Sequence, residues 1–352
     1  MATLIRHAGL FCLGFLFLFC ETYEPETKTY TVRTIAFYNV ENLFDTLNDT
    51  LVYDDDRTPE GKDKWTELRY KKKIGDISKV LSGMGADVTG SSPDIIGLCE
   101  IEKQEVLEAL INHHNLKDKN YGIIHLDSPD ERGMDVALLY KRSSFQPISF
   151  QSRRLLIYNK WQDRDYTRDQ LVVSGMLDHE PIHFIVNHWP SRSGGEARSR
   201  PGRLSAAKLN RRIMDSLRKL DPEAKIISMG DLNDNPNDDS IKLILEARNT
   251  KDGLAPEELY NPMESLYKKG HGTLAYRDEW SLFDQILISG SLTTVDIKTF
   301  TYWKVGIYNP PYLITQTGRY KGYPFRTYAG GSYTGGYSDH FPVYIALYKA
   351  AD

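Results

Sequence analysis

The chain has 352 residues, of which 40% are hydrophobic and 26% are charged, and its net charge is −4 at pH 7. This composition is typical of a globular protein with a sizeable core and excludes a mainly disordered chain. The negative balance also excludes a protein that binds nucleic acid by neutralising phosphates over its whole surface, because such proteins are basic. Binding of a polyanion would therefore need a local basic patch or a metal ion.

An apolar run, residues 8–20, follows Arg6 near the N-terminus. The run has the length of a signal-peptide core and is too short to span a membrane comfortably. We therefore expect residues 1–20 to be a signal peptide and the protein to be exported, to the periplasm, the outer membrane or the extracellular space. Cys20 stands where a bacterial lipid-anchor cysteine would tether the protein to a membrane. Leu18 and Phe19 before it, however, are not the small residues that such cleavage sites prefer.

The other two cysteines are Cys12, inside the apolar run, and Cys99. Removal of the leader takes Cys12 with it and leaves Cys99 without an intramolecular partner, apart from Cys20 at the cleavage point. The chain therefore has no disulfide framework, and the cysteine pattern does not indicate a zinc site.

Short runs rich in β-branched and aromatic residues alternate with helical patterns along the rest of the chain. The predicted strands cover residues 31–40, 94–99, 134–140, 170–177, 182–187, 225–229, 283–288 and 341–348. The predicted helices cover residues 67–81, 105–113, 203–219 and 240–247. Neither a linker nor a repeat divides the series, so we expect one α+β domain over residues 30–350, with two packed sheets and helices outside them.

Three segments read as long loops. Residues 47–64 carry Asp54, Asp55 and Asp56, and a solvated loop is favoured there over a metal site. Residues 189–203 contain four arginines and follow a strand, and residues 302–337 are rich in Tyr, Gly and Pro. Long connections of this kind frequently carry function.

Polar residues recur at the ends of the predicted strands. They are Asn39, Glu41, Glu100, His188, Asp231, Asn233, Asp284, Asp339 and His340. Each alone would be read as a cap, a turn or a structural hydrogen bond. Together they supply hard oxygen ligands that suit Mg²⁺, Mn²⁺ or Ca²⁺, beside two histidines. A metal ion, a histidine and a carboxylate are what the attack of water on a phosphoryl group requires.

Seven sequence blocks carry a resemblance to a known family. They are FYNVENLFD (37–45), DIIGLCE (94–100), RGMDVALLY (132–140), NHWPSR (187–192), MGDLND (229–234), FDQILIS (283–289) and YSDHFPV (337–343). In this order they resemble the signature blocks of the endonuclease/exonuclease/phosphatase superfamily, which includes DNase I-like nucleases. The resemblance covers nearly all of the chain after residue 30. It implies a DNase I-like, four-layer α/β-sandwich: two packed mixed β-sheets flanked by helices.

The resemblance also implies a metal site. Asn39 and Glu41 match the family's Asn-x-Asp/Glu element near the metal, and Glu100 matches its principal metal-ligand glutamate. The family usually has Gln before that glutamate, where this chain has Cys99. Asp339 matches an additional carboxylate of the metal or phosphate site. The expected cofactor is Mg²⁺, with Mn²⁺ or Ca²⁺ as alternatives.

Five further residues match catalytic positions of the family. Asp231 matches the aspartate that orients or activates the attacking water, and Asn233 matches the amide that binds the phosphate. Asp284 matches the carboxylate that orients the last histidine, His340. His188 resembles the general acid of DNase I-like and sphingomyelinase-like members, which abasic-site endonucleases lack at this block. Two histidines therefore favour an exported hydrolase over a DNA-repair enzyme.

Two features bear on the substrate. Of the arginines after His188, Arg192 is expected to bind phosphate, with Arg132 as a second candidate, whereas Arg200 and Arg203 also fit the solvated start of the next helix. The tyrosines of residues 302–337 are interleaved with Arg319, Lys321 and Arg326. They could stack bases, rest on a lipid, line a sugar-phosphate pocket, or simply pack on one another.

The sequence therefore predicts a metal-dependent phosphodiester hydrolase, with DNA or RNA the favoured substrate and no protein partner expected. A sphingomyelinase-like enzyme or an inositol-phosphate phosphatase is the enzymatic alternative. A non-catalytic surface binding protein is the third reading, which the retention of every matched catalytic position argues against.

Overall fold

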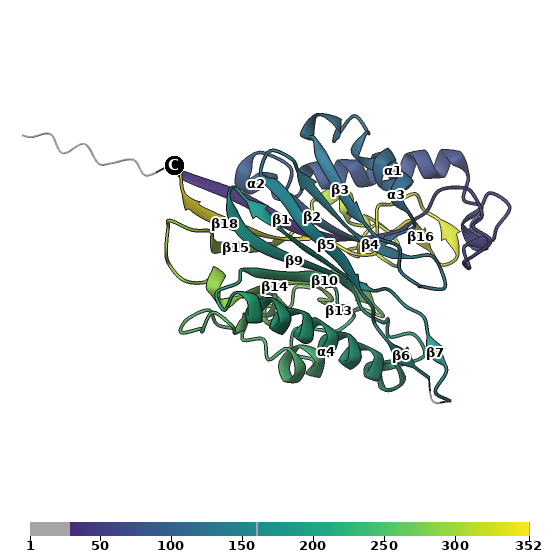
Figure 1. Ribbon diagram of the computed structural model, residues 1–352. Helices are drawn as coiled ribbons and strands as arrows, with labels where there is room; N and C mark the ends of the chain where they lie inside the picture. Colours follow the sequence, from purple (N-terminus) through teal and green to yellow (C-terminus); the bar gives the residue numbers. More distant parts are fainter. Residues whose placement is uncertain (1–28, 160, 352) are drawn as a thin grey trace, which may run out of the picture.

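The computed structural model describes residues 29–159 and 161–351, so the predicted signal peptide and Cys20 lie outside the described residues. Its frame is a pair of six-stranded sheets (Figure 1). The first sheet has the order β15 (Thr301–Ile307), β18 (Val343–Ala350), β1 (Tyr30–Leu43), β2 (Ile95–Ile101), β4 (Asp135–Lys141) and β3 (Tyr121–His125). The second has the order β11 (Leu259–Tyr260), β14 (Asp284–Ser289), β10 (Ile226–Asp231), β9 (Glu180–His188), β8 (Gln170–Leu177) and β5 (Phe145–Arg153).

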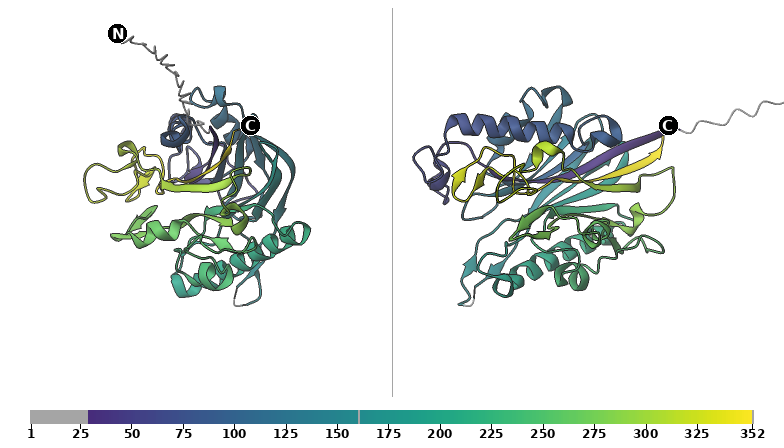
Figure 2. Two further views of the ribbon diagram at one scale, coloured as in Figure 1. Left: turned by 90° about the vertical axis from the view of Figure 1, so that its left-hand side faces the viewer. Right: turned by 180° about the vertical axis from the view of Figure 1, so that it is seen from behind.

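Helices cover the outer face of each sheet, which makes the four layers visible in Figures 1 and 2. The first sheet is covered by α1 (Glu67–Gly83) and α3 (Gln104–Ile111), and the second by α4 (Glu196–Leu220). The shorter elements are the helices α2 (Ala86–Thr89) and α5 (Met263–Lys268), the strand pairs β6 (Ile157–Tyr158) with β7 (Arg164–Asp165), β12 (Leu274–Tyr276) with β13 (Glu279–Ser281) and β16 (Tyr328–Ala329) with β17 (Ser332–Tyr333), and the helical turns η1 (Asp55–Arg57), η2 (Lys117–Lys119), η3 (Ser240–Ile244), η4 (Gly290–Leu292) and η5 (Pro311–Leu313). In the described part of the chain, no helix has both the length and the apolar character needed to cross a membrane.

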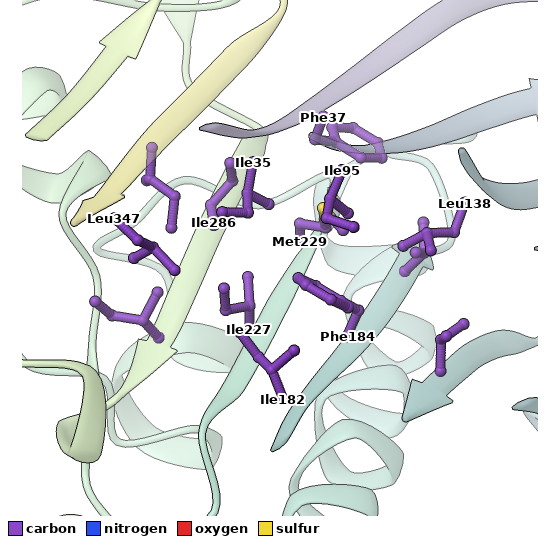
Figure 3. Packing of buried hydrophobic residues seen from close by; sticks show 14 of the residues in the cluster. Ile35, Phe37, Ile95, Leu138, Ile182, Phe184, Ile227, Met229, Ile286 and Leu347 are labelled. Carbon is purple, nitrogen blue, oxygen red and sulfur yellow. The ribbon is translucent and has the colours of Figure 1, made fainter. Parts of the chain in front are cut away.

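Three hydrophobic layers hold the sandwich together, and their division follows the alternation of side chains along each strand. In β1, Ile35 and Phe37 point into the layer between the sheets, whereas Ala36 and Tyr38 face α1 and α3. Figure 3 shows the layer between the sheets, where Met229 packs among side chains of both sheets. A strand buried on both faces reads as a nearly continuous apolar run, which is why the sequence predicted these strands well.

Each sheet contains one parallel pair of strands, and these pairs position the site. β1 and β2 are parallel and are connected through α1, while β9 and β10 are parallel and are connected through α4. Strands β2 and β9 also contact each other across the sandwich, as do β1 and β10. Because the carboxyl ends of parallel strands meet at one edge, residues following all four strands gather at one place.

Several predictions about segments need correction. Four strands of the two six-stranded sheets were missed, β3, β5, β11 and β15, as were the three short strand pairs, and β15 occupies the start of the Tyr-rich segment that read as a loop. Only the first part of the arginine-rich segment, residues 189–195, is a loop: Gly194 and Gly195, both with positive φ, turn the chain into α4, which begins at Glu196. Arg203, expected on a solvated face, is fully buried. Asp54 of the acidic loop is buried as well, and accepts a hydrogen bond from the Asp49 amide at 2.9 Å.

Candidate active site

Asn39 lies at the centre of the site and joins the two sheets. Its Nδ2 donates to Glu100 Oε1 and to Asp231 Oδ2, both at 3.1 Å. β1 and β2 shift register between Asn39 and Leu43, with Glu41 and Asn42 at positive φ in one strand and Glu100 at positive φ in the other. Irregularities of this kind re-aim side chains at strand ends. Here the Asn42 amide donates to Glu100 Oε2 at 2.9 Å and fixes that carboxylate.

His340 and Asp284 form a buried pair. His340 Nδ1 lies 2.7 Å from Asp284 Oδ2, and the other ring nitrogen lies 3.9 Å from Asp231 Oδ2. Burial alone would lower the pKa of His340. The charge and hydrogen bond of Asp284, with the charges of Asp231 and Asp339, outweigh burial and raise the pKa well above its ordinary value. The imidazole is therefore protonated at neutral pH, with Asp284 fixing its orientation.

His188 reaches the same centre from β9. Its Nε2 lies 3.9 Å from both Glu100 Oε1 and Asp231 Oδ2. Burial lowers the pKa of His188 well below its ordinary value, and the charges of Arg168, Arg132 and His340 lower it further. The surroundings thus shift the pKa values of the two histidines in opposite directions, upward for His340 and downward for His188. The general-acid role of His188 stays a prediction.

Asp231 and Asn233 follow β10. The Asn233 amide donates to Asp231 Oδ1 at 3.0 Å, and Asn233 Nδ2 donates to the Trp189 carbonyl at 3.0 Å. Burial raises the pKa of Asp231 to about 7, although the charge of His340 opposes the rise. A carboxylate with a pKa near neutrality is suited to accept a proton from an attacking water.

Glu41 and Asp339 lie beside the Tyr-rich segment, through contacts with Arg326 and Thr327 that sequence reasoning did not predict. Arg326 Nη2 donates to Asp339 Oδ2 at 2.5 Å and Arg326 Nε lies 3.6 Å from Glu41 Oε1. Glu41 Oε2 accepts the Thr327 amide at 2.6 Å. Burial, with the charge of Asp339, raises the pKa of Glu41 to about 7. The Tyr-rich segment is therefore bonded directly to the predicted metal-site carboxylates.

Lys73 of α1 is a second feature that sequence reasoning missed. It is buried, and its Nζ donates to Thr327 Oγ1 at 2.6 Å and to the Tyr337 carbonyl at 2.5 Å. Burial lowers its pKa to about 8, while the charges of Glu41, Asp339 and Glu100 oppose the lowering. The signal was present in the sequence, because Lys73 occupies the apolar stripe that Ile77 and Leu81 continue.

The predicted phosphate-binding arginines occupy different environments. Arg192 is bound to carboxylates: its Nη2 lies 3.1 Å from Asp234 Oδ1 and 2.5 Å from Asp238 Oδ2. The side chain of Arg132 is 51% exposed beside the site. Arg168, which the sequence did not single out, is buried, and donates to the Trp189 carbonyl at 2.9 Å. Asn233 Nδ2 donates to the same carbonyl, so this guanidinium lies beside the candidate active site.

The donor set fits a hard divalent cation. Glu100 and Asp231 share the Asn39 amide, and Glu41 and Asp339 share the Arg326 guanidinium, so four carboxylates offer oxygen ligands close together. Ligand atoms of Asp231, Asp284 and His340 also lie within 4.8 Å of one another. Since Asp284 is already bonded to His340, we interpret that trio as a histidine held for catalysis.

Comparison with known proteins agrees with this geometry. Residues 34–349 match the profile of the "Endonuclease/Exonuclease/phosphatase family". No curated protein sequence matches the chain.

Solved structures of similar fold include humanized D. rerio TDP2 (15% identity, TM-score 0.53, covering 90% of this chain and 98% of that chain). A second is an endonuclease/exonuclease/phosphatase family protein from Bacteroides thetaiotaomicron (16% identity, TM-score 0.54, covering 92% of this chain and 97% of that chain). A third is a mannosyl-6-phosphatase from the same organism (16% identity, TM-score 0.53, covering 90% of this chain and 99% of that chain). At such low identity the likeness shows the shared fold, whereas the profile match spans nearly the whole described chain. The chain belongs to the endonuclease/exonuclease/phosphatase family.

Proposed function

We propose that this protein is a phosphodiester hydrolase that depends on Mg²⁺ or Mn²⁺ and acts on nucleic acid. One observation carries the proposal: Asn39 bonds both Glu100 and Asp231, next to a histidine that Asp284 orients. These residues come from both sheets and meet at the ends of the two parallel pairs. Phosphoryl transfer to water needs this combination of positioned charge and a proton acceptor.

Each residue has a defined task in this mechanism. As the water oxygen bonds to phosphorus, Asp231 Oδ accepts the proton of the water, for which its raised pKa suits it, and the bond from phosphorus to the leaving oxygen breaks. The His340 imidazolium, oriented by Asp284, donates a hydrogen bond to the phosphoryl oxygen as negative charge develops. Glu100 and Asn39, with Glu41 and Asp339 nearby, would hold the cation. When bound, the cation supplies Lewis-acid stabilisation of the phosphoryl oxygens.

A second candidate is a phosphomonoesterase. Among the solved structures of similar fold, a D. rerio TDP2 structure is described as "complexed with single strand DNA product", and the Bacteroides thetaiotaomicron structure is a mannosyl-6-phosphatase. One description indicates nucleic acid and the other a sugar phosphate. A third possibility, a sphingomyelinase-like activity, rests only on the sequence resemblance.

Assays with paired substrates separate these functions. Purified protein with Mg²⁺ or Mn²⁺ is assayed on bis-p-nitrophenyl phosphate, p-nitrophenyl phosphate, single-stranded DNA, mannose 6-phosphate and sphingomyelin. We expect diesters and DNA to be hydrolysed, and activity to be lost in His340→Ala but retained in the control His271→Ala, whose residue is exposed. Preference for the monoesters would favour the second candidate. Equal activity of His340→Ala and wild type would refute the assignment of the site.

A further inference from the structure

A pocket outside the catalytic centre is lined mainly by arginine and tyrosine side chains. It has a volume of about 280 Å³ and is lined by Ala275, Tyr276, Arg277, Asp278, Arg319, Tyr320, Tyr323 and Arg326. Three guanidinium groups and three phenol rings thus share one small hollow with a single carboxylate. This is a local basic patch on a protein whose net charge is −4.

The charges of two of these arginines are not neutralised by a carboxylate in the described residues. In the described ranges 29–159 and 161–351, Arg277 and Arg319 form no salt bridge; each instead lies against a tyrosine ring. The guanidinium carbon of Arg277 is 5.2 Å from the Tyr276 ring centre, and that of Arg319 is 5.8 Å from the Tyr320 ring centre. Aromatic faces hold a guanidinium in position without neutralising it. The hydrogen-bond donors of both side chains therefore remain free for an anion.

The turn that carries Arg277 is one that an L residue adopts at a cost. Tyr276 pairs with Glu279, so Arg277 and Asp278 form a two-residue hairpin turn, with φ values of 52° and 66°. Turns with two positive φ angles strongly favour Asn-Gly. Arginine here is thus not explained by the needs of the backbone.

The pocket is built before any ligand arrives. Tyr323 Oη donates to Asp278 Oδ1 and accepts the Asp278 amide, both at 2.6 Å, which ties the hairpin to the opposite wall. The segment that carries Tyr323 is itself held by an isolated antiparallel β-bridge between Ile314 and Pro324. A site held in its binding shape loses little conformational freedom on binding.

The side chain of Arg326 connects the pocket to the catalytic centre. Arg326 lines the pocket and also bonds Asp339 Oδ2. On the hairpin side, Trp280 stacks on Phe341, the neighbour of His340, at 6.1 Å between ring centres and 14° between planes. In Figure 2 the yellow segment that contains Arg319–Arg326 extends from one side of the sandwich. A substrate held at His340 can therefore extend into the pocket.

We propose that this arginine–tyrosine pocket binds a second phosphate group of the substrate, next to the phosphate that is cleaved. The inference rests on the proposed function and narrows it to substrates with two phosphates on neighbouring sugars or on one nucleoside. Arg277 and Arg319 bind the second phosphate, and the tyrosine rings pack against the attached sugar or base. The volume admits a phosphate with part of its nucleoside, near the lower limit of ordinary ligand sites of roughly 300 Å³.

A binding measurement tests the pocket without requiring turnover. The full chain carrying Asp231→Asn, which removes the proton acceptor and keeps His340, is titrated by calorimetry in the presence of Mg²⁺ with thymidine 3′,5′-bisphosphate and with each thymidine monophosphate. We expect the bisphosphate to bind about tenfold or more tightly than either monophosphate, as charge-assisted hydrogen bonds predict. Adding Arg277→Gln and Arg319→Gln removes this preference. The matched control is Arg142→Gln, since Arg142 is exposed and lies 5.7 Å from the Tyr140 ring centre.

A kinetic measurement separates failure of the pocket from failure of the proposed function. Wild-type protein is assayed on the dinucleotide dTpdT and on its forms with a 5′- or a 3′-terminal phosphate. We expect kcat/KM to be about tenfold higher for one phosphorylated form, and the Arg277→Gln/Arg319→Gln protein to lose that ratio. If diesters are cleaved but neither measurement shows a preference, the pocket assignment is overturned. If no diester is cleaved while the bisphosphate preference persists, the pocket stands and the proposed reaction falls.

Discussion

Asp284→Asn is the sharpest test of the catalytic arrangement, because it keeps the size of the side chain and removes its charge. Asp284 is fully buried and its Oδ2 lies 2.7 Å from His340 Nδ1. A hydrogen bond to a charged group contributes about 1.5–3 kcal/mol, and about 1.4 kcal/mol is a factor of ten in rate. We therefore expect kcat on bis-p-nitrophenyl phosphate to fall by about 10- to 150-fold, with a smaller change in KM.

The pH profile distinguishes this mechanism from simple loss of structure. Asp284 is a main cause of the raised pKa of His340, so wild-type activity should persist until the pH rises through that pKa. In Asp284→Asn the pKa of His340 is lower, and the alkaline limb of the profile should move to lower pH. The control is Asp127→Asn, since the Asp127 side chain is 92% exposed. A folded Asp284→Asn protein with wild-type kcat and an unmoved alkaline limb would contradict the reasoning.

Three further predictions concern stability and the metal. Glu180 accepts hydrogen bonds from Lys225 and Thr299, and these outweigh the effect of burial and lower the pKa of Glu180. Glu180→Gln should therefore lower the free energy of unfolding by about 1–3 kcal/mol at pH 7. A carboxylate with a lowered pKa stabilises the folded protein fully only at a pH above the ordinary glutamate pKa of 4.5. The difference in unfolding free energy between wild type and Glu180→Gln, measured with urea, should therefore shrink as the pH falls below 4.5. Phe184→Ala in the layer between the sheets should cost about 3–5 kcal/mol in the same assay, with m unchanged. Mg²⁺ should raise the melting temperature of the wild-type protein, and a chelator should reverse this shift. The shift should be smaller in Glu100→Gln. Equal shifts in the two proteins would show that Glu100 is not a ligand of the metal.

Strands buried on both faces were predictable, since they are apolar almost without interruption. The sequence located β8 (Gln170–Leu177) with the bounds that the structure has, and β1 and β10 within a few residues. β5 lies at the edge of its sheet, with Ile148 and Phe150 exposed, so it lacks the apolar run that identifies a buried strand. The start of α4 was missed because glycine, arginine and proline in succession read as a loop.

The catalytic positions could be named from their order in the chain, but their neighbours could not. Asp284 and His340 are 56 residues apart, and a resemblance was enough to pair them. The contact between Glu41 and Thr327 spans 286 residues and depends on how the Tyr-rich segment folds back, which no local pattern encodes. The aromatic and cationic character of that segment was visible in the sequence, whereas the pocket was not, because half of its lining comes from a hairpin more than 40 residues earlier.

The pairing of β1 with β18 has a consequence for the order in which the protein can form. Tyr30 lies opposite Ala350, and the register continues to Phe37 opposite Val343, so the first strand of the domain is completed by its last. During synthesis β1 therefore has an unpaired edge until β18 has emerged and paired with it. His340 precedes the same strand by only two residues. Assembly of the candidate active site and closure of that edge thus depend on the same segment of the chain.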